Sequence, residues 1–362
     1  MFTKLKIALA LTAIMVLSSC ESINDDYANC GVWLEFVFDH NMEYTDSFYP
    51  QVETVDVYIF DQSGKFVQTI HAATSDLDRN KRMFLGNMPF GEYKILAVGN
   101  LTEHFRFTDR NGVDFVPGTT TIEHAMSALK HNGMVSHEFS HFYFGQAVEV
   151  AYNADLSVYM IPLIRQTNNF NIVLQTVVKS PENSQGAIES VHTVEIVAPE
   201  SGAYDWLNNP VAPNELIYHP YYLISRIYPF KDETLLETVA KINTMRLLEN
   251  ESNGYRIIIR DVKTGEELWS KDLVSLLADT KIGEGKRPDG TELPLSEYLD
   301  REGNWNIVIV YISGANIGNE DPVDPDPDPD PDPGPVTPNN AFTAIRININ
   351  NWIVWQQGIE LN

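Results

Sequence analysis

The sequence predicts a mainly β protein built from two tandem β-sandwich domains with short helical insertions. Its 362 residues are enough for about two domains. It contains 16 Tyr and 17 Phe, which favour strands. Short β-rich runs are also joined by glycine-containing turns, as where 55–60 leads through 61–64 into 65–70. We place the first sandwich at residues 32–164 and the second at 165–362.

The first domain is expected to consist of strands around one helix. The expected strands cover 32–38, 55–60, 65–70, 93–98, 147–152 and 156–163. The predicted helix begins at Thr120, which forms a capping box with Glu123. Apolar residues then follow at helical spacing, namely Ile122, Ala125, Met126 and Leu129.

The second domain repeats this β-rich pattern. Strands are expected over 169–178, 191–197, 241–248, 255–262, 266–269, 306–312, 342–350 and 352–356, and short helices over 272–278 and 295–301. The segment 235–248 also fits a helix, because it is rich in Leu and Ala, although we favour a strand.

An Asp-Pro-rich loop at 320–338 projects from this domain. Its prolines predict an extended polyproline-II rod that spans roughly 45 Å. A calcium site there is disfavoured, because alternate prolines keep the carboxylates from folding around one ion.

The N-terminus carries the signal of a bacterial lipoprotein. Lys4 and Lys6 precede an apolar run over 7–17, which is too short to span a bilayer and typical of a signal peptide. The run ends in Leu17-Ser18-Ser19-Cys20, a lipobox. We therefore predict a signal peptide at 1–19, cleavage between Ser19 and Cys20, lipid attachment to Cys20 and a lipidated tether at 20–31. The alternative is an ordinary secretory signal with an incidental cysteine.

The predicted location is the cell outer membrane, with the lipid-anchored body exposed on the surface. Glu21, Asp25 and Asp26 follow the lipidated cysteine, as in the export signal of surface lipoproteins. No later segment is apolar enough for a transmembrane span in the mature chain. No cofactor is expected apart from the covalent lipid on Cys20, and Cys30 is expected to be a buried free thiol.

The charge of the chain excludes one class of partner. The formal net charge is -25 at pH 7, and only part of it comes from the Asp-Pro-rich loop. Since phosphates require a basic face, nucleic acid is not an expected ligand.

One motif points to catalysis. His137-Glu138-Phe139-Ser140-His141 matches the H-E-x-x-H signature of zinc proteases, in which two histidines one helical turn apart hold the metal. The aromatic run that follows, beginning at Phe142, suits a strand, and Phe144 and Ala147 replace the Gly and His of the extended motif. We therefore assign no metal site and no catalytic residue, and keep a zinc hydrolase only as the weakest alternative, with His137, Glu138 and His141 as candidates.

Tryptophans support another alternative, a surface glycan-binding lipoprotein. An exposed indole can stack on a sugar ring, and six are available, although strand positions favour core packing for at least half of them. They are Trp33, Trp206, Trp269, Trp305, Trp352 and Trp355.

A series of short motifs resembles the lipoprotein anchor subunits of Bacteroidetes-type (type V) fimbriae, the FimB-like family. The resemblance covers nearly the whole mature chain, although the Asp-Pro-rich loop departs from it. The motifs, in order, are Cys30-Gly31-Val32, 36–42, 55–61, 64–66, 91–94, Phe144-Gly145, Thr167-Asn168 and 347–352.

The resemblance implies that both domains are transthyretin-like and that the H-E-x-x-H segment lies in a loop leading into a strand. It also implies a structural role and no enzymatic one: the protein would hold the base of a fimbrium to the outer membrane and end its growth, with a fimbrial shaft subunit as partner.

The lack of basic residues after Cys20 independently suits an anchor. Shaft subunits of such fibres are thought to be cleaved after a basic residue near the N-terminus. Between Cys20 and Lys65 this chain has no Arg or Lys, so it should keep its lipid and its first strand.

Overall fold

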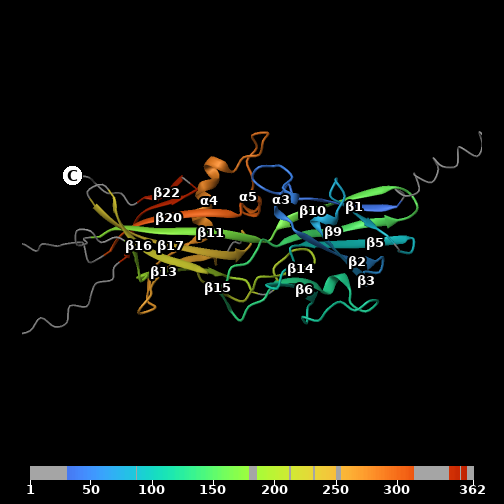
Figure 1. The fold of residues 1–362 in the computed structure, drawn as a ribbon, viewed down its shortest axis with the longest axis horizontal. Helices are drawn as coiled ribbons and strands as arrows, with labels where there is room; N and C mark the ends of the chain where they lie inside the picture. The colour runs from blue at the N-terminus through green and yellow to red at the C-terminus, as the bar shows by residue number, and fades with distance from the viewer. Residues whose placement is uncertain are drawn as a thin grey trace, which may run out of the picture.

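The protein is an elongated arrangement of β-sheets, seen in Figure 1 in a computed structural model. The structure describes residues 31–86, 88–178, 186–211, 213–230, 233–249, 254–313, 342–350 and 352–356. The predicted signal peptide, lipid site, tether, Cys30 and Asp-Pro-rich loop lie outside these residues.

Within the described residues, the first half of the chain supplies ten strands. They are β1 (Val32–Val37), β2 (Thr54–Asp61), β3 (Phe66–Ala73), β4 (Arg82–Leu85), β5 (Gly91–Gly99), β6 (Phe105–Asp109), β7 (Ala125–Leu129), β8 (Met134–Val135), β9 (Tyr143–Tyr152) and β10 (Ser157–Arg165). Seven of them form one sheet in the order β3-β2-β5-β9-β10-β1-β4.

This sheet folds over on itself at β10. Residues Ser157 to Pro162 pair in parallel with β1, whereas Leu163 to Arg165 pair with β9. Pro162 has no N–H to donate, which suits a strand that changes partner at this point. Alternate residues of β1 and β2, such as Phe36 and Val57, therefore face each other in one buried core.

The outer face of β2 and β5 is also covered. Tyr58 and Phe60 belong to a second core, together with Phe105 and Phe107 of β6. Since β2 is covered on both faces, its run from Val57 to Phe60 is apolar at every position.

The described part of the second half supplies twelve strands. They are β11 (Thr167–Val177), β12 (Gly186–Ile188), β13 (His192–Ala198), β14 (Ala203–Asp205), β15 (Leu216–Tyr218), β16 (Tyr222–Phe230), β17 (Glu233–Met245), β18 (Arg256–Asp261), β19 (Glu267–Asp272), β20 (Asn304–Ser313), β21 (Phe342–Ile349) and β22 (Trp352–Gln356). They form a seven-stranded sheet, β12-β16-β17-β11-β20-β21-β22, and most of a five-stranded sheet, β19-β18-β13-β15-β8. The prediction of a mainly β, sandwich-like protein is confirmed.

Two short strands cross between the halves. β8 joins the five-stranded sheet through β15, and β14 joins β6 and β7 in a three-stranded sheet. The core that begins at Tyr58 accordingly continues to Phe170 and Ile307. The halves are thus tied together by backbone pairing as well as by side-chain packing.

Three short α-helices complete the described fold, namely α3 (Phe48–Gln51), α4 (Leu273–Glu284) and α5 (Leu295–Arg301). The expected helices at 272–278 and 295–301 are confirmed, while α3 was not foreseen. Within the described residues, no helix has the length and apolar character needed to span a bilayer.

The predicted helix at 120–129 is wrong. A short 3-10 turn (Ile122–His124) leads into β7, all five residues of which are buried between β6 and β14. The Thr120 hydroxyl accepts a hydrogen bond from the Val116 N–H at 2.9 Å instead of capping a helix. A strand covered on both faces can be apolar at almost every position, as β7 is except at Ser127, so it also satisfies a helical pattern.

Most of the ambiguous segment 235–248 is a strand, as favoured. Residues 235–245 belong to β17, which begins and ends earlier than expected and pairs with β11 and β16, while 246–248 lie outside regular secondary structure. Its two neighbours supply hydrogen bonds along its length, and this tertiary context overrides the helix propensity of Leu and Ala.

Candidate functional site: an amide-lined groove where the two halves meet

The H-E-x-x-H segment is an extended loop that leads into β9. The side chain of His137 stacks on that of His104, with ring centroids 4.5 Å apart. Burial and the neighbouring His104 lower the pKa of His137. Because the loop is not helical, its two histidines do not share the helix face that a zinc protease needs.

His141 faces the other way, into the junction between the halves. Its Nδ1 atom lies 3.0 Å from Thr167 Oγ1, and its Nε2 atom accepts a hydrogen bond of 3.2 Å from the Asn169 amide. Burial, reinforced by the charge of Arg165, lowers the pKa of His141 to about 4. The ring is therefore neutral at pH 7, as an Nε2 acceptor must be.

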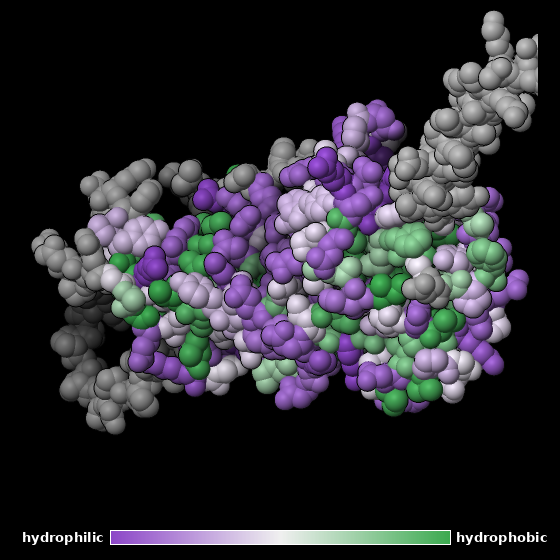
Figure 2. Space-filling view, turned by 45° about the vertical axis from the view of Figure 1, so that its right-hand side comes forward, coloured by the Kyte–Doolittle hydropathy of each residue, from purple (hydrophilic) through white to green (hydrophobic). Residues whose placement is uncertain are grey.

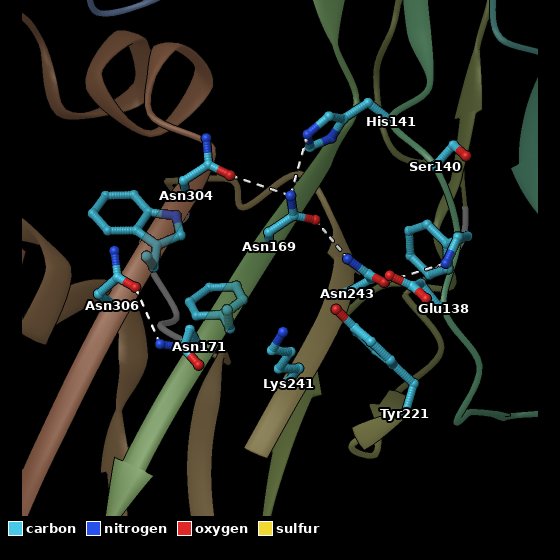
Figure 3. Close-up of a pocket in the computed structure, with 13 residues that line it drawn as sticks. Glu138, Ser140, His141, Asn169, Asn171, Tyr221, Lys241, Asn243, Asn304 and Asn306 are labelled. Atoms are coloured by element: carbon cyan, nitrogen blue, oxygen red, sulfur yellow. Dashed lines mark hydrogen bonds between the residues drawn. The ribbon is translucent and has the colours of Figure 1, made fainter. Parts of the chain in front are cut away.

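Asn169 is the centre of an asparagine ladder that runs across three strands. Its amide donates to Asn304 Oδ1 on β20 at 3.2 Å, and its own oxygen accepts from the Asn243 amide on β17 at 2.5 Å. One step along the sheet, Asn171 donates to Asn306 Oδ1 at 3.3 Å. Figure 3 shows these amides on neighbouring strands, to one side of the loop.

The ladder forms the floor of a groove of about 480 Å³. Glu138, Ser140 and His141 of the loop line one wall, and Tyr221 and Lys241 line another. Asn243 joins the floor to the loop, because its Oδ1 accepts a hydrogen bond from the Phe139 N–H at 3.2 Å. The loop is therefore held against the sheet by its backbone.

Ser140, His141 and Asn304 also border a second hollow of about 620 Å³ on the side of the first domain. Glu138 to Ser140 border a third hollow of about 320 Å³. The loop is thus a ridge between adjoining depressions at the junction.

Two arginines link the halves across the junction. Arg165 is buried and donates to the backbone oxygen of Arg301 at 3.2 Å. Arg301 reaches back to the first half, where its Nη1 atom donates to the backbone oxygens of Asp39 and Asn41. Its guanidinium also lies 4.5 Å from the ring centroid of Tyr44, within the range of a cation–π contact.

The groove is suited to binding. Its floor is made of neutral amides, and an amide can both donate and accept hydrogen bonds, although the Asn169 amide nitrogen already donates to His141 and Asn304. Among the residues that the structure describes, no group of three or more His, Cys, Asp or Glu side chains could hold a metal ion. Such a surface favours a ligand rich in hydroxyl or amide groups.

The sequence did not point to these asparagines. Asn169 with Asn171, and Asn304 with Asn306, each stand two positions apart in a strand, so they face the same side. That spacing was the available signal, but it identifies a ladder only when the register of β11 and β20 is known.

The six tryptophans take different positions. Trp305 is fully buried, while Trp206 and Trp269 are half-buried and pack against the same core. Trp33 lies partly exposed against Phe84, with ring centroids 5.1 Å apart. The side chains of Trp352 and Trp355, like Ser19 and Cys20, lie outside what the structure describes.

Comparison with known proteins now assigns the family. The model of the fimbrillin-A associated anchor proteins Mfa1 and Mfa2 matches residues 21–358. The chain belongs to this family of fimbrial anchor proteins. The resemblance noted in the sequence is thereby confirmed.

Solved structures agree with this assignment. A protein from Bacteroides ovatus, described as a candidate adhesin, is 37% identical, with a TM-score of 0.72, over 91% of this chain and 97% of that one. The fimbrial anchor protein Mfa2 from Porphyromonas gingivalis is 17% identical, with a TM-score of 0.58, over 90% and 99%.

A protein from Bacteroides thetaiotaomicron, described as a candidate polysaccharide-binding protein, is 22% identical, with a TM-score of 0.66, over 92% and 100%. The two structures below 25% identity show the shared fold. The comparison with curated proteins gave no significant match.

Proposed function

We propose that this member of the fimbrial anchor family is a lipoprotein of the outer membrane, attached through Cys20, that holds the base of a fimbrium to the cell surface. One observation carries the proposal: β1 is an interior strand of its sheet. It pairs with β10 on one side and with β4 on the other, and it begins twelve positions after Cys20. A pull on the lipid therefore reaches the folded body through a strand that is held on both sides.

The same pairing supports a role in ending fibre growth. A subunit that receives a donated strand must first expose an open groove in its sheet. Here β1 occupies its place, and no Arg or Lys between Cys20 and Lys65 offers a trypsin-like enzyme a site to remove it. The first domain is then closed to a further subunit at the membrane end.

The shaft subunit, in this proposal, docks on the second domain by strand addition or edge contact. The seven-stranded sheet of that domain ends in two edge strands, β12 and β22. All three residues of β12 (Gly186–Ile188) are exposed. An edge strand has free backbone groups that can pair with an incoming chain.

Mass analysis of the protein that copurifies with the fimbrial polymer tests this assignment. The expected mass is that of an acylated chain that begins at Cys20 and retains β1. A chain that begins beyond Lys65 would contradict it, and so would a crosslinking map that places every polymer contact on residues 20–31.

The groove supports a second candidate function, recognition of a neutral saccharide. Hydroxyl groups both donate and accept hydrogen bonds, as the Asn171 and Asn306 amides do, and Lys241 and Tyr221 border the same space. A volume of about 480 Å³ falls within the usual range for small-molecule sites.

Calorimetric titration with neutral oligosaccharides tests this second function. Asn171→Ala with Asn306→Ala should weaken any binding by at least about ten-fold, since each amide supplies hydrogen bonds of about 1 kcal/mol. Gln175→Ala is the matched control, because Gln175 lies on the same strand outside the groove and bonds to Glu237. Equal binding by both variants would exclude the groove as the site.

A further inference from the structure

The first domain exposes an apolar face on the outer side of β4, β1 and β10. We call it the tether-side face and define it by five residues, of which Trp33 is half-buried and the other four are exposed by 42–61%. They are Trp33, Phe84, Leu156, Val158 and Met160. Figure 2 shows hydrophobic side chains gathered over this half of the molecule.

Strand register explains why these side chains share one face. Trp33 of β1 lies opposite both Phe84 of β4 and Val158 of β10, so the three form a row across the sheet. Val32 and Leu34, the neighbours of Trp33 in sequence, are fully buried in the core, and Tyr159, between Val158 and Met160, is partly buried against it. The row therefore points outward, where a polar surface would be expected on a soluble sheet.

The next row contains one ion pair and one apolar residue. Glu35 lies opposite Met160 on one side and Arg82 on the other, and the Arg82 guanidinium lies 2.8 Å from the Glu35 carboxylate. The charges of this row thus neutralise each other. The tether-side face carries no excess positive charge for attraction to anionic groups.

The chain enters the domain directly beside this face. Gly31 precedes β1 with a φ of +125°, and a Cβ atom there would come within 2.7 Å of the Phe84 ring. Gly31 is therefore needed for the chain to pass close under Phe84. Further exposed apolar groups lie at the same end, since Phe90, which is 72% exposed, packs on Tyr152 at the end of β9.

The distance to the predicted lipid is short. Cys20 and Gly31 are eleven positions apart, so even a fully extended chain spans at most about 40 Å between them. An acyl chain on Cys20 would therefore hold the start of β1, which lies beside this face, within that distance of the bilayer. Aromatic and long apolar side chains are the groups that settle at a membrane interface.

We propose that the tether-side face rests on the lipid surface and inserts Trp33, Phe84 and Met160 at the boundary between headgroups and acyl chains. The orientation rests on the proposed lipid attachment at Cys20. The contact itself is a property of the folded domain and adds a second, reversible attachment to the covalent one. Its basis is apolar, because the chain as a whole carries a net charge of -25.

Vesicle flotation of the mature chain with Cys20→Ser tests the contact without any acyl chain. Vesicles of phosphatidylethanolamine and phosphatidylglycerol should carry the protein upward, and about 0.5 M salt should not release it, because the contact is not electrostatic. Phe84→Ser with Met160→Ser should lower the bound fraction by at least about five-fold. Leu207→Ser with Val211→Ser is the matched control, since both residues are exposed but lie in the second half of the chain.

Brominated lipids locate the contact. They should quench the fluorescence of the wild-type protein, and Trp33→Phe should remove that quenching while the other five tryptophans remain. Equal flotation by the Phe84/Met160 variant and the control, or quenching that survives in Trp33→Phe, would overturn the proposal. A protein that forms dimers through the face, lost in the Phe84/Met160 variant, would assign it to a second copy instead.

These outcomes are separate from those that test the anchor. The flotation assay uses a chain without the acyl group on Cys20. A protein that binds vesicles in this assay but is never acylated in the cell would therefore refute the proposed function alone. An acylated chain that shows no contact between Trp33 and lipid would refute only this inference.

Discussion

The Arg301 guanidinium donates a hydrogen bond of 3.2 Å to the backbone oxygen of Asp39, 262 positions earlier in the chain. The same nitrogen donates to the Asn41 oxygen at 3.1 Å, so one side chain of α5 holds the loop that follows β1. For an anchor, this link is mechanically important, because it joins the domain next to the tether to the domain that carries the proposed docking edges.

Arg301→Ala should destabilise the junction. It removes three hydrogen bonds from a charged donor, namely those to the Asp39 and Asn41 carbonyl groups and the one to the Glu297 carboxylate, at a cost of about 3 kcal/mol in the free energy of unfolding. Urea denaturation of the mature chain measures this change. Arg256→Ala, which removes an exposed arginine of β18, should shift the free energy by less than about 0.5 kcal/mol. Equal effects of the two substitutions would contradict the assigned role of Arg301.

Gly303→Ala should be as damaging as the loss of Arg301. A Cβ atom at Gly303 would overlap the guanidinium of the buried Arg165. Displacing that group breaks its hydrogen bond to Arg301 and costs about 2–4 kcal/mol. Gly91→Ala is the matched control, because the nearest atom to its Cβ would be 3.8 Å away. A Gly303→Ala protein as stable as this control, by thermal unfolding, would show that Arg165 has room to move.

Glu200 should make stability fall as the pH rises. Burial raises the pKa of its carboxyl to about 7, although hydrogen bonding from Tyr255 and the charge of Arg246 act in the opposite direction. Between a pH of about 4.5 and 7 the folded protein therefore binds more protons at Glu200 than the unfolded chain does. Folding loses up to about 3 kcal/mol of stability across this window.

Glu200→Gln isolates this effect, since glutamine keeps an acceptor for Tyr255 but cannot ionise. His40 and His141, whose pKa values are lowered to about 4, act in the opposite direction in the same pH range. The quantity to measure is therefore the difference between wild type and variant in unfolding free energy at pH 5 and pH 8. The variant should gain relative to wild type as the pH rises, and a difference that does not change with pH would refute the raised pKa of Glu200.

Sequence patterns predicted β1, β2 and β5 from local periodicity, but they did not predict β4, β6 or β16. Alternation in β1 and the glycine turn after β2 depend on neighbours in the sequence, and both features are present. β7 was mistaken for a helix because burial on both faces erases the two-residue period. The signal that distinguishes the two lies in β6 and β14, and β14 is far away in the chain.

Long-range features were beyond what a single sequence can show. The exchange of partners at Pro162, the pairing of β8 with β15 and the asparagine ladder all depend on register between distant segments. The H-E-x-x-H motif shows that a sequence can also match a known signature whose geometry the structure lacks. Its spacing suggests zinc, whereas its histidines are turned apart by an extended backbone, towards His104 and Thr167.

The most direct test of the anchor is to compare wild type with Cys20→Ala in the native cell. This protein and the fimbrial polymer would be followed by fractionation and electron microscopy. If Cys20 is the physical link between fibre and cell, both should move together from the outer membrane into the medium. Release of the protein while fibres stay attached, or the absence of any fibre that cofractionates with it, would contradict the account.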